Sequence, residues 1–98
     1  MANSLFAISA YNQNQLVGLI RVVGDGLTII YIQDLLVNPA YQRQGIGTKL
    51  INSVLKKYNS VRQKVLLTEN TVKTRRFYES CNFHPCDKYN LIAFYIDF

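Results

Sequence analysis

The stretch from Val37 to Tyr58, which reads VNPAYQRQGIGTKLINSVLKKY, constrains the fold more than any other part of this sequence. An apolar run ends at Asn38-Pro39, because proline cannot donate to a sheet and disfavours helical geometry in the residue before it. From Gly45 onward, apolar residues recur every three to four positions. These residues are Ile46, Leu50, Ile51, Val54, Leu55 and Tyr58. The stretch therefore predicts a strand, a short loop and an amphipathic helix over Gly45–Tyr58.

The loop before this helix is typical of an anion-binding site. The first turn of a helix has unpaired N–H groups and the positive end of the helix dipole, and glycine lets the backbone approach an anion without a Cβ in between. Gly45 and Gly47 lie in this segment, flanked by Arg43 and Lys49. A plain strand-to-helix connection whose glycines serve packing explains the same pattern, and both interpretations stay open.

The composition indicates one globular domain spanning residues 1–98. Hydrophobic residues make up 49% of the chain and charged residues only 17%, which is too apolar for a disordered chain. No apolar run reaches the length of a membrane span, and the N-terminus lacks the basic start of a signal peptide. Cys81 and Cys86 have no metal-ligand spacing, so we expect free buried thiols, no metal and a cytoplasmic location.

Taken in order, the chain predicts a mixed α/β sheet. A second helix is expected from Asn70 or Thr71 to about Cys81, with Val72, Phe77 and Cys81 facing inward. The strand–helix–strand order predicts a right-handed parallel crossover, and Gly24-Asp25-Gly26 predicts a hairpin turn. Strands are expected over Leu5–Ala10, Leu16–Val23, Leu27–Val37, Val65–Thr68 and Leu91–Phe98. The third of these is nearly continuous in apolar residues, which predicts burial on both faces.

Two segments resemble the GNAT superfamily of acetyl-coenzyme A-dependent N-acetyltransferases. Gln42-x-x-Gly45-x-Gly47 resembles its (Gln/Arg)-x-x-Gly-x-(Gly/Ala) signature, and the preceding DLLVNPAYQ resembles its central strand and turn. The later FYESCNF resembles its FYE-x-x-GF segment, with Asn82 in place of glycine. Asparagine tolerates the left-handed conformation that glycine serves at a helix C-terminus. The resemblance implies a GNAT-like fold with an antiparallel hairpin, a parallel crossover, a second helix and a closing antiparallel strand.

The resemblance also implies a cofactor site. Acetyl-CoA is expected as the acetyl donor, its pantetheine arm paired with the first of two parallel strands that splay apart. Its pyrophosphate is expected on backbone N–H groups of the loop, with the Thr48 hydroxyl as a further donor. Asn70 lies one residue away from the register of the family's asparagine, where Thr71 stands. The cofactor-binding residues implied in this way are Leu35, Leu36, Val37, Gln42, Arg43, Gln44, Gly45, Ile46, Gly47, Thr48, Asn70 and Arg75.

Three residues are candidates for proton transfer when the amine of an acceptor attacks the thioester. By resemblance, Tyr78 is the general acid that protonates the leaving thiolate; a core aromatic with a satisfied hydroxyl is the alternative. Asp34 and Glu69 are candidate bases, because the family's early-strand glutamate is replaced by apolar residues and a tyrosine at positions 30–32. For Asp34 the alternative is a cross-strand ion pair, and for Glu69 a capping or solvent-exposed carboxylate.

The partners follow from charge and from the start of the chain. The net charge of +5 suits a phosphate-bearing ligand; nucleic acid is disfavoured, because the aromatic residues sit in apolar strands and not among the basic residues. Few residues precede Leu16, where the family usually has helices that wall the acceptor site. The alternative function is therefore an acetyl-CoA-binding or interaction module without turnover. A homodimer that covers the site or the aromatic terminal strand is also predicted.

Overall fold

The computed structural model describes residues 5–96. These residues belong to two compact units, one ending at Leu67 and the other beginning at Thr68, and each unit is described by itself. That the whole chain acts as one domain stays a prediction.

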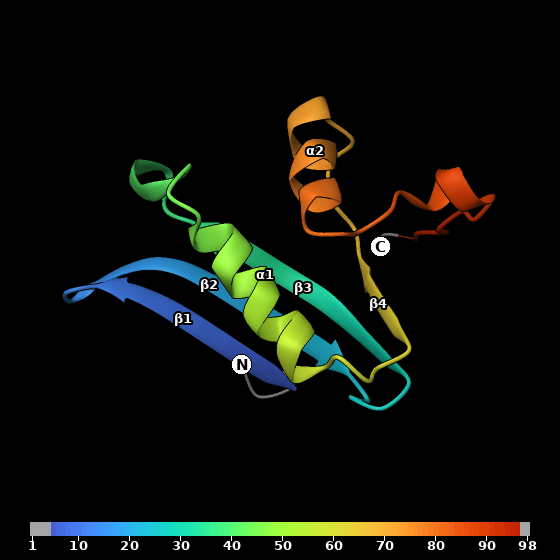
Figure 1. Cartoon of the computed structure of the whole chain (residues 1–98), viewed down its shortest axis with the longest axis horizontal. Helices are drawn as coiled ribbons and strands as arrows, with labels where there is room; N and C mark the ends of the chain where they lie inside the picture. The colour runs from blue at the N-terminus through green and yellow to red at the C-terminus, as the bar shows by residue number, and fades with distance from the viewer. Residues whose placement is uncertain (1–4, 97–98) are drawn as a thin grey trace. The chain divides into compact units, whose positions relative to one another are not determined.

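The first unit is a four-stranded sheet with a helix on one face. Its strands are β1 (Phe6–Asn12), β2 (Gln15–Gly24), β3 (Ile29–Val37) and β4 (Gln63–Leu66), which lie in that order. The pairs β1–β2 and β2–β3 are antiparallel and β3–β4 is parallel. The helix α1 (Ile46–Lys57) lies across the sheet in Figure 1, after the short 3-10 helix η1 (Pro39–Tyr41). The predicted mixed sheet with a hairpin and a parallel crossover is confirmed.

The helix α1 packs on the sheet through the face that the sequence predicts. Its side chains at Leu50, Ile51 and Val54 are buried. The close approach of helix and sheet requires Gly18 in β2, because a Cβ at this position would lie 2.9 Å from Ile46 Cγ2 and 3.1 Å from Leu50 Cδ1. The buried residues opposite the helix are Val17, Ile20, Val22, Ile30 and Ile32. Burial of these apolar side chains is the main term that stabilises the unit.

The turn between β2 and β3 is held by Asp25. Its carboxylate accepts hydrogen bonds from the N–H groups of Leu27, Thr28 and Ile29 at 2.9, 2.9 and 3.0 Å, and from the Thr28 hydroxyl at 2.6 Å. These hydrogen bonds, that of the Thr28 hydroxyl first, hold the pKa of Asp25 well below its usual range. Gly24 has a φ of 134°, and a Cβ there would lie 2.5 Å from the Ile29 carbonyl oxygen. The predicted hairpin turn is confirmed.

The strand β3 is less buried than its sequence predicts. Ile30 and Ile32 are buried, but Ile29, Gln33 and Leu36 are exposed. The prediction of burial on both faces is wrong, because within the first unit α1 covers one face only.

The second unit contains the helix α2 (Val72–Ser80) and the 3-10 helix η2 (Cys86–Tyr89). Thr71 caps α2, since its side-chain oxygen accepts a hydrogen bond from the Thr74 N–H at 3.1 Å. Of the two predicted caps, Thr71 is therefore the one that forms.

The C-terminus of α2 closes with a Schellman motif. Asn82 has a φ of 72°, the Phe83 N–H donates to the Tyr78 carbonyl, and the Asn82 N–H donates to the Glu79 carbonyl, each at 3.0 Å. The motif usually brings together the side chains at these two helix positions, and the rings of Tyr78 and Phe83 do meet edge to face with centroids 6.0 Å apart. The prediction that Asn82 takes the left-handed conformation is confirmed.

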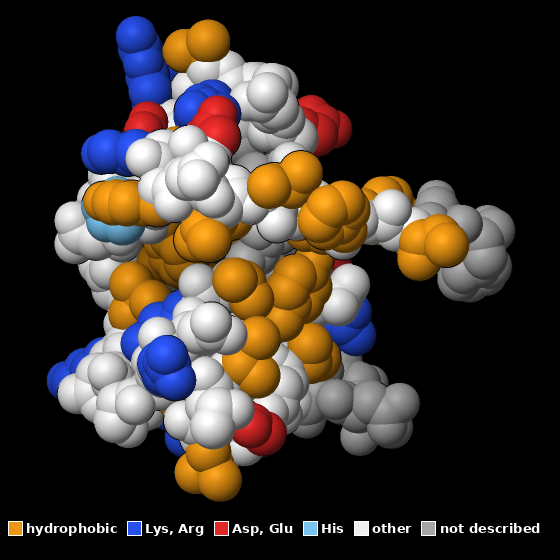
Figure 2. Space-filling view, turned by 90° about the vertical axis from the view of Figure 1, so that its right-hand side faces the viewer, with side chains coloured by type: hydrophobic (Ala, Val, Ile, Leu, Met, Phe, Trp, Pro, Cys, Tyr) orange, Lys and Arg blue, Asp and Glu red, His pale blue; other side chains and the backbone are white. Residues whose placement is uncertain are grey.

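The predicted closing strand Leu91–Phe98 is wrong over residues 91–96, which are not part of a strand; residues 97 and 98 lie outside the described part. A strand needs a neighbour for its backbone hydrogen bonds, and the Leu91 N–H instead donates to the Cys86 carbonyl at 2.9 Å. The alternating apolar side chains consequently face solvent, with Phe94 91% and Ile96 93% exposed. Figure 2 shows hydrophobic side chains (orange) exposed on the face it draws.

Two smaller expectations in the second unit are corrected. Val72, predicted to face inward, is 66% exposed because it begins the first turn of α2. Both cysteines are free, but only Cys81 is buried; Cys86 lies in η2 and is exposed. Within residues 5–96, no helix has the length and apolarity that crossing a membrane would require.

Candidate active site

The loop between η1 and α1 presents a run of backbone donors. Arg43 and Gly45 have φ angles of 67° and 81°, and the cap of α1 has no side-chain hydrogen bond. The first backbone donor of the helix to find a protein acceptor is Lys49, whose N–H bonds the Gly45 carbonyl at 3.0 Å. From Arg43 to Thr48, no N–H donates to another described residue. Six consecutive donors at a helix N-terminus form an arrangement that binds anions.

Gly45 and Gln42 shape this loop in different ways. A Cβ at Gly45 would meet no atom within 4 Å, so the space beside the glycine is open. The left-handed backbone at Gly45, and not crowding, is what favours glycine there. Gln42 begins the loop, and its side-chain Nε2 makes a long contact of 3.5 Å with the Val37 carbonyl oxygen. The side chain of Gln42 therefore ties the loop to the end of β3.

Next to this loop, one edge of β3 is open, in that it pairs with no described strand beyond Ile32. The parallel pairing with β4 ends at Ile32↔Leu66, while the pairing with β2 continues to Val37. The Asn38 N–H donates to the Val17 carbonyl of β2 at 2.8 Å. Because donors alternate in direction along a strand, the Leu36 N–H also faces β2, and those of Leu35 and Val37 face the open edge.

The open edge begins where β3 is irregular. Arg21 of β2 pairs with Asp34 and the next residue, Val22, pairs with Ile32, which leaves Gln33 as an extra residue in β3. A bulge of this kind bends and twists a strand, and this one lies immediately after the last pair with β4. The bulge gives a physical reason for the end of the parallel pairing.

Asp34 takes part in a cross-strand ion pair. Its Oδ2 lies 2.7 Å from Arg21 Nη2, and both side chains are about one-third exposed. Arg21 Nε is buried without a hydrogen-bond partner among the described residues. The structure thus contains the ion pair that was the alternative interpretation of Asp34, and the carboxylate is engaged by a guanidinium.

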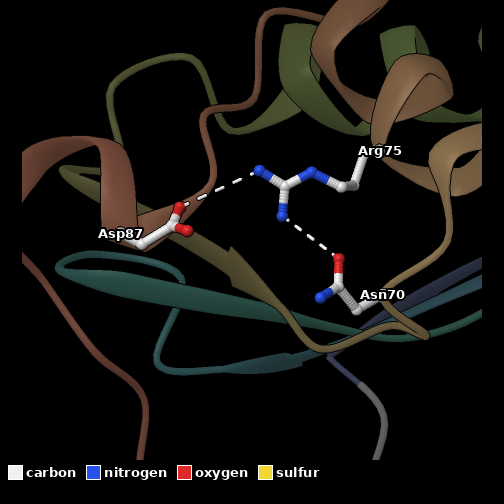
Figure 3. A network of polar contacts seen from close by, with 3 residues as sticks. All are labelled: Asn70, Arg75 and Asp87. Carbon is white, nitrogen blue, oxygen red and sulfur yellow. Dashed lines mark hydrogen bonds and ion pairs between the residues drawn. The ribbon is translucent and has the colours of Figure 1, made fainter.

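In the second unit, the predicted cofactor residues Asn70 and Arg75 contact each other. Arg75 Nη1 donates to Asn70 Oδ1 at 3.1 Å, and Arg75 Nη2 lies 3.9 Å from Asp87 Oδ1, as Figure 3 shows. The bond from Arg75 engages the carbonyl of Asn70 and leaves its amide NH₂ as the group available to a ligand. Glu69 precedes them and is exposed; its carboxylate forms no ion pair with a described residue.

Tyr78 lies on α2, where its ring packs against neighbouring aromatic rings and its hydroxyl donates no hydrogen bond to a described residue. The ring meets Phe77 and Phe83 edge to face, with centroids 5.0 and 6.0 Å apart. Burial, and after it the neighbouring Cys81, raises the pKa of Tyr78 above its usual 10.0. Within residues 5–96 the hydroxyl donates to no protein group. It can therefore serve as a proton donor at neutral pH.

The predicted site residues divide between the two units. The first unit brings together the loop 42–48 and the open edge of β3, and the second brings together Asn70 and Arg75 and carries Tyr78. Sequence reasoning missed the bulge at Gln33, for which the only signal was a polar pair inside an apolar strand. It also missed Tyr41 in η1, whose hydroxyl accepts from Asn12 Nδ2 at 3.0 Å and contacts Gln15 Oε1 at 3.3 Å.

Comparison with known proteins places this arrangement in a family. Residues 3–85 match the model of the acetyltransferase (GNAT) domain. A GNAT-family acetyltransferase from Streptococcus pneumoniae has a structure with a TM-score of 0.93, is 39% identical, and is matched over 98% of this chain and 74% of its own. The chain therefore belongs to the GNAT acetyltransferase family.

Two further structures are similar. A protein of unknown function from meticillin-resistant Staphylococcus aureus, named a probable acetyltransferase, is 27% identical with a TM-score of 0.82 over 99% of this chain and 74% of its own. An aminoglycoside N-acetyltransferase in complex with CoA shares the fold at 14% identity, with a TM-score of 0.71 over 93% of this chain and 74% of its own. No curated protein matches this chain.

Proposed function

We propose that this protein transfers an acetyl group from acetyl-CoA to a primary amine of a small molecule or protein, by direct attack of the amine on the thioester. The observation that carries the proposal is the run of six uncommitted N–H groups from Arg43 to Thr48 at the N-terminus of α1. Such donors, with Arg43 beside them, suit a pyrophosphate. Membership of the acetyltransferase family also supports acetyl-CoA as the donor of the acetyl group.

The open edge of β3 supports a site for the pantetheine arm. An extended, amide-containing ligand can pair with a free strand edge as an added strand would. The groups that face the edge belong to Leu35 and Val37, whereas the backbone of Leu36 faces β2. We therefore assign the backbone hydrogen bonds to the pantetheine arm to Leu35 and Val37. The side chain of Leu36, which is 58% exposed, is assigned to packing against the arm.

For the second unit, we propose that Tyr78 donates its proton to the leaving sulfur. We also propose that the amide NH₂ of Asn70 donates a hydrogen bond to the pantetheine arm. A thiol has a pKa of about 8.5 and tyrosine about 10, so complete transfer from tyrosine costs about 2 kcal/mol. Burial adds to that cost. The step is therefore useful only while charge develops on the sulfur, and water then restores the proton of the phenol.

Two carboxylates remain as candidates for the base, and we favour Glu69. The carboxylate of Asp34 is occupied by Arg21 at 2.7 Å, whereas that of Glu69 forms no described ion pair. Substituting Glu69→Gln should lower turnover and shift its pH profile, while Asp34→Asn should lower the stability of the fold. The reverse outcome would move the base to Asp34.

The test of acetyl-CoA binding is a matched pair of substitutions at Gly45. Gly45→Asn and Gly45→Asp have the same shape and make the same demand on the left-handed backbone, and only the second adds a negative charge. Calorimetry should show acetyl-CoA affinity at least about tenfold lower for Gly45→Asp than for Gly45→Asn, a difference of about 1.4 kcal/mol. Equal affinities would remove the pyrophosphate from this loop.

A separate measurement decides whether binding leads to turnover. A free-thiol assay with acetyl-CoA and a panel of primary amines should show CoA release that depends on the amine. Tight acetyl-CoA binding with no release from any amine would instead identify a binding module without turnover.

Homodimerisation stays a prediction and rests on exposed apolar side chains. Leu91, Ile92, Phe94 and Tyr95 are between 61% and 91% exposed, and soluble proteins tend to cover such surfaces. Light scattering at high micromolar concentration should show a dimer, and a monomer there would count against the prediction.

A further inference from the structure

The start of α2 brings two polar side chains together, those of Asn70 and Arg75. Thr71 caps α2, so Asn70 lies one residue before the cap and Arg75 is the fourth residue of the helix. In many helices these two positions carry apolar side chains that pack on each other. Here a hydrogen bond takes the place of that apolar contact, because Arg75 Nη1 donates to Asn70 Oδ1 at 3.1 Å (Figure 3).

The backbone at both ends of this contact is fixed by hydrogen bonds. The Thr71 N–H donates to the Glu69 carbonyl at 3.0 Å, which makes Asn70 the central residue of a three-residue turn. The Arg75 N–H donates to the Thr71 carbonyl at 2.9 Å and closes the first turn of the helix. Helix side chains lean toward the N-terminus, and Arg75 accordingly reaches back to Asn70. What the contact between them fixes is therefore the side-chain torsions of Asn70.

The stability of α2 gives no reason for an arginine at this position. The N-terminus of a helix is the positive end of its dipole, which disfavours a cation in the first turn, and the first turn of α2 has no acidic residue to offset it. The other branch of the guanidinium, Nη2, lies 3.9 Å from Asp87 Oδ1, but the two side chains are 40% and 78% exposed, and such ion pairs contribute little. The contact with Asn70 is the one that calls for an explanation.

A guanidinium can hold an asparagine side chain in one orientation only. Arginine has N–H donors and no acceptor, so it selects the carbonyl oxygen of Asn70 and leaves the NH₂ pointing the other way. An asparagine without such a partner has about six arrangements, from three χ1 wells and two orientations of the amide. A ligand that needs the NH₂ binds more weakly to a mixture of arrangements than to the one that fits it.

We propose that Arg75 is a positioning residue, which fixes the amide of Asn70 for the pantetheine arm of acetyl-CoA and does not itself contact the ligand. The proposal rests on the proposed function, in which the NH₂ of Asn70 donates to that arm. It gives Arg75 a different role from the direct cofactor contact that the family resemblance implies. An arginine that contacted the ligand directly would act independently of Asn70, whereas a positioning residue acts only through it.

The experiment is a double-mutant cycle on acetyl-CoA affinity, measured by calorimetry for Asn70→Ala, Arg75→Met and the double variant. Asn70→Ala should weaken binding by about fivefold, because it removes one hydrogen bond. Arg75→Met should weaken binding by about threefold, because only about one arrangement in six then keeps that bond. The double variant should lose about fivefold and not about fifteenfold, since Arg75 has nothing to position once Asn70 is replaced by alanine.

Two further variants separate positioning from charge and from folding. Arg76→Met removes the neighbouring arginine of α2, which is exposed and forms no ion pair with a described residue, and it should leave the affinity unchanged. Asn70→Asp keeps an acceptor for Arg75 and loses the NH₂. This variant should bind acetyl-CoA at least about fivefold more weakly, while circular dichroism shows melting no lower than that of the wild type, because Arg75 now pairs with a carboxylate.

Three results would overturn the positioning role of Arg75 and leave the proposed function intact. They are wild-type affinity in Arg75→Met, a loss in the double variant equal to the product of the two single losses, and a loss in Arg76→Met as large as that in Arg75→Met. Wild-type affinity in Asn70→Ala would remove Asn70 from the ligand contacts and this inference with it, while the Gly45 test would still stand. Absence of acetyl-CoA binding by the wild type would overturn the proposed function and this inference together.

Discussion

The two units of this protein are stabilised in different ways. Ten of the eleven buried hydrophobic side chains of the described chain lie in the first unit, and only Cys81 lies in the second. The helix α1 has an apolar face against a sheet whose residues come from distant parts of the sequence. The helix α2 has no fully buried residue and is fixed by its ends, with Thr71 at the start and Asn82 at the end.

This difference separates structure that neighbouring residues in the sequence can stabilise from structure that needs residues far apart in the sequence. A cap or a Schellman motif needs residues only a few positions apart, so α2 is specified by its own segment. A core needs side chains that meet after the chain has folded. We expect substitutions in the first unit to alter global stability and those in the second to alter local order or chemistry.

The largest expected effect is at the centre of the first unit. Ile51 is fully buried, and Ile51→Ala should lower the free energy of unfolding by about 3 kcal/mol, because it removes apolar contacts and leaves a cavity. Its counterpart in the second unit is Val72→Ala, which should change stability by less than about 0.5 kcal/mol. Urea denaturation measures both, and similar losses of stability from the two substitutions would contradict this difference between the units.

The next effect concerns chemistry in the second unit. Tyr78→Phe keeps the ring that packs between Phe77 and Phe83 and removes only the hydroxyl. Turnover should fall about 10²-fold, the lower end for general acid–base catalysis, with acetyl-CoA affinity and stability nearly unchanged. Since burial raises the pKa of Tyr78 above 10.0, the wild type should keep its proton donor through pH 10. Wild-type turnover by the variant, with chemistry rate-limiting, would exclude Tyr78 from the mechanism.

Much of the fold was predictable because its signals are local or periodic. The apolar spacing of α1 identified its buried face, Gly24-Asp25-Gly26 identified the hairpin, and Asn82 identified a left-handed helix end. The prediction of a closing strand was wrong over residues 91–96, because alternation is a pattern of side chains. A strand also requires a neighbouring strand that accepts and donates its backbone hydrogen bonds. The prediction that both faces of β3 are buried was wrong for a similar reason, since an apolar run does not reveal how many faces of the strand are covered.

The candidate site was predictable in part for the same reasons. The glycine loop before α1 is local, and the structure gives it the uncommitted donors that the sequence indicated. The open edge of β3 depends on the register between three strands and on the bulge at Gln33. The ion pair of Asp34 depends on Arg21, thirteen positions earlier in the sequence. No local pattern contains such pairings.

A smaller effect should separate backbone conformation from packing at the end of α2. Asn82 has a φ of 72°, where most side chains cost about 1–2 kcal/mol and asparagine or glycine much less. Asn82→Ala should therefore lower stability by about 1 kcal/mol, and Asn82→Gly should not. Urea denaturation compares the two, and equal losses would assign the effect to the amide side chain and not to the backbone.

The smallest effect tests whether a local hydrogen-bonded turn also contributes to the stability of the first unit, which is stabilised mainly by its core. The pKa of Asp25 is lowered in the folded protein, so its contribution to stability is present above the unfolded pKa of about 3.9 and is lost as the pH falls through the folded value. Asp25→Ala should thus melt at a lower temperature than the wild type at pH 7, and the difference should shrink below about pH 4. Asp25→Asn keeps an acceptor oxygen without the charge, so its own melting deficit should be smaller than that of Asp25→Ala at neutral pH. Melting curves by circular dichroism at pH 7, 5, 3 and 2 measure these differences. A deficit for Asp25→Ala that is as large at pH 2 as at pH 7 would show that the turn is held by shape alone, and that the charge of Asp25 adds nothing to it.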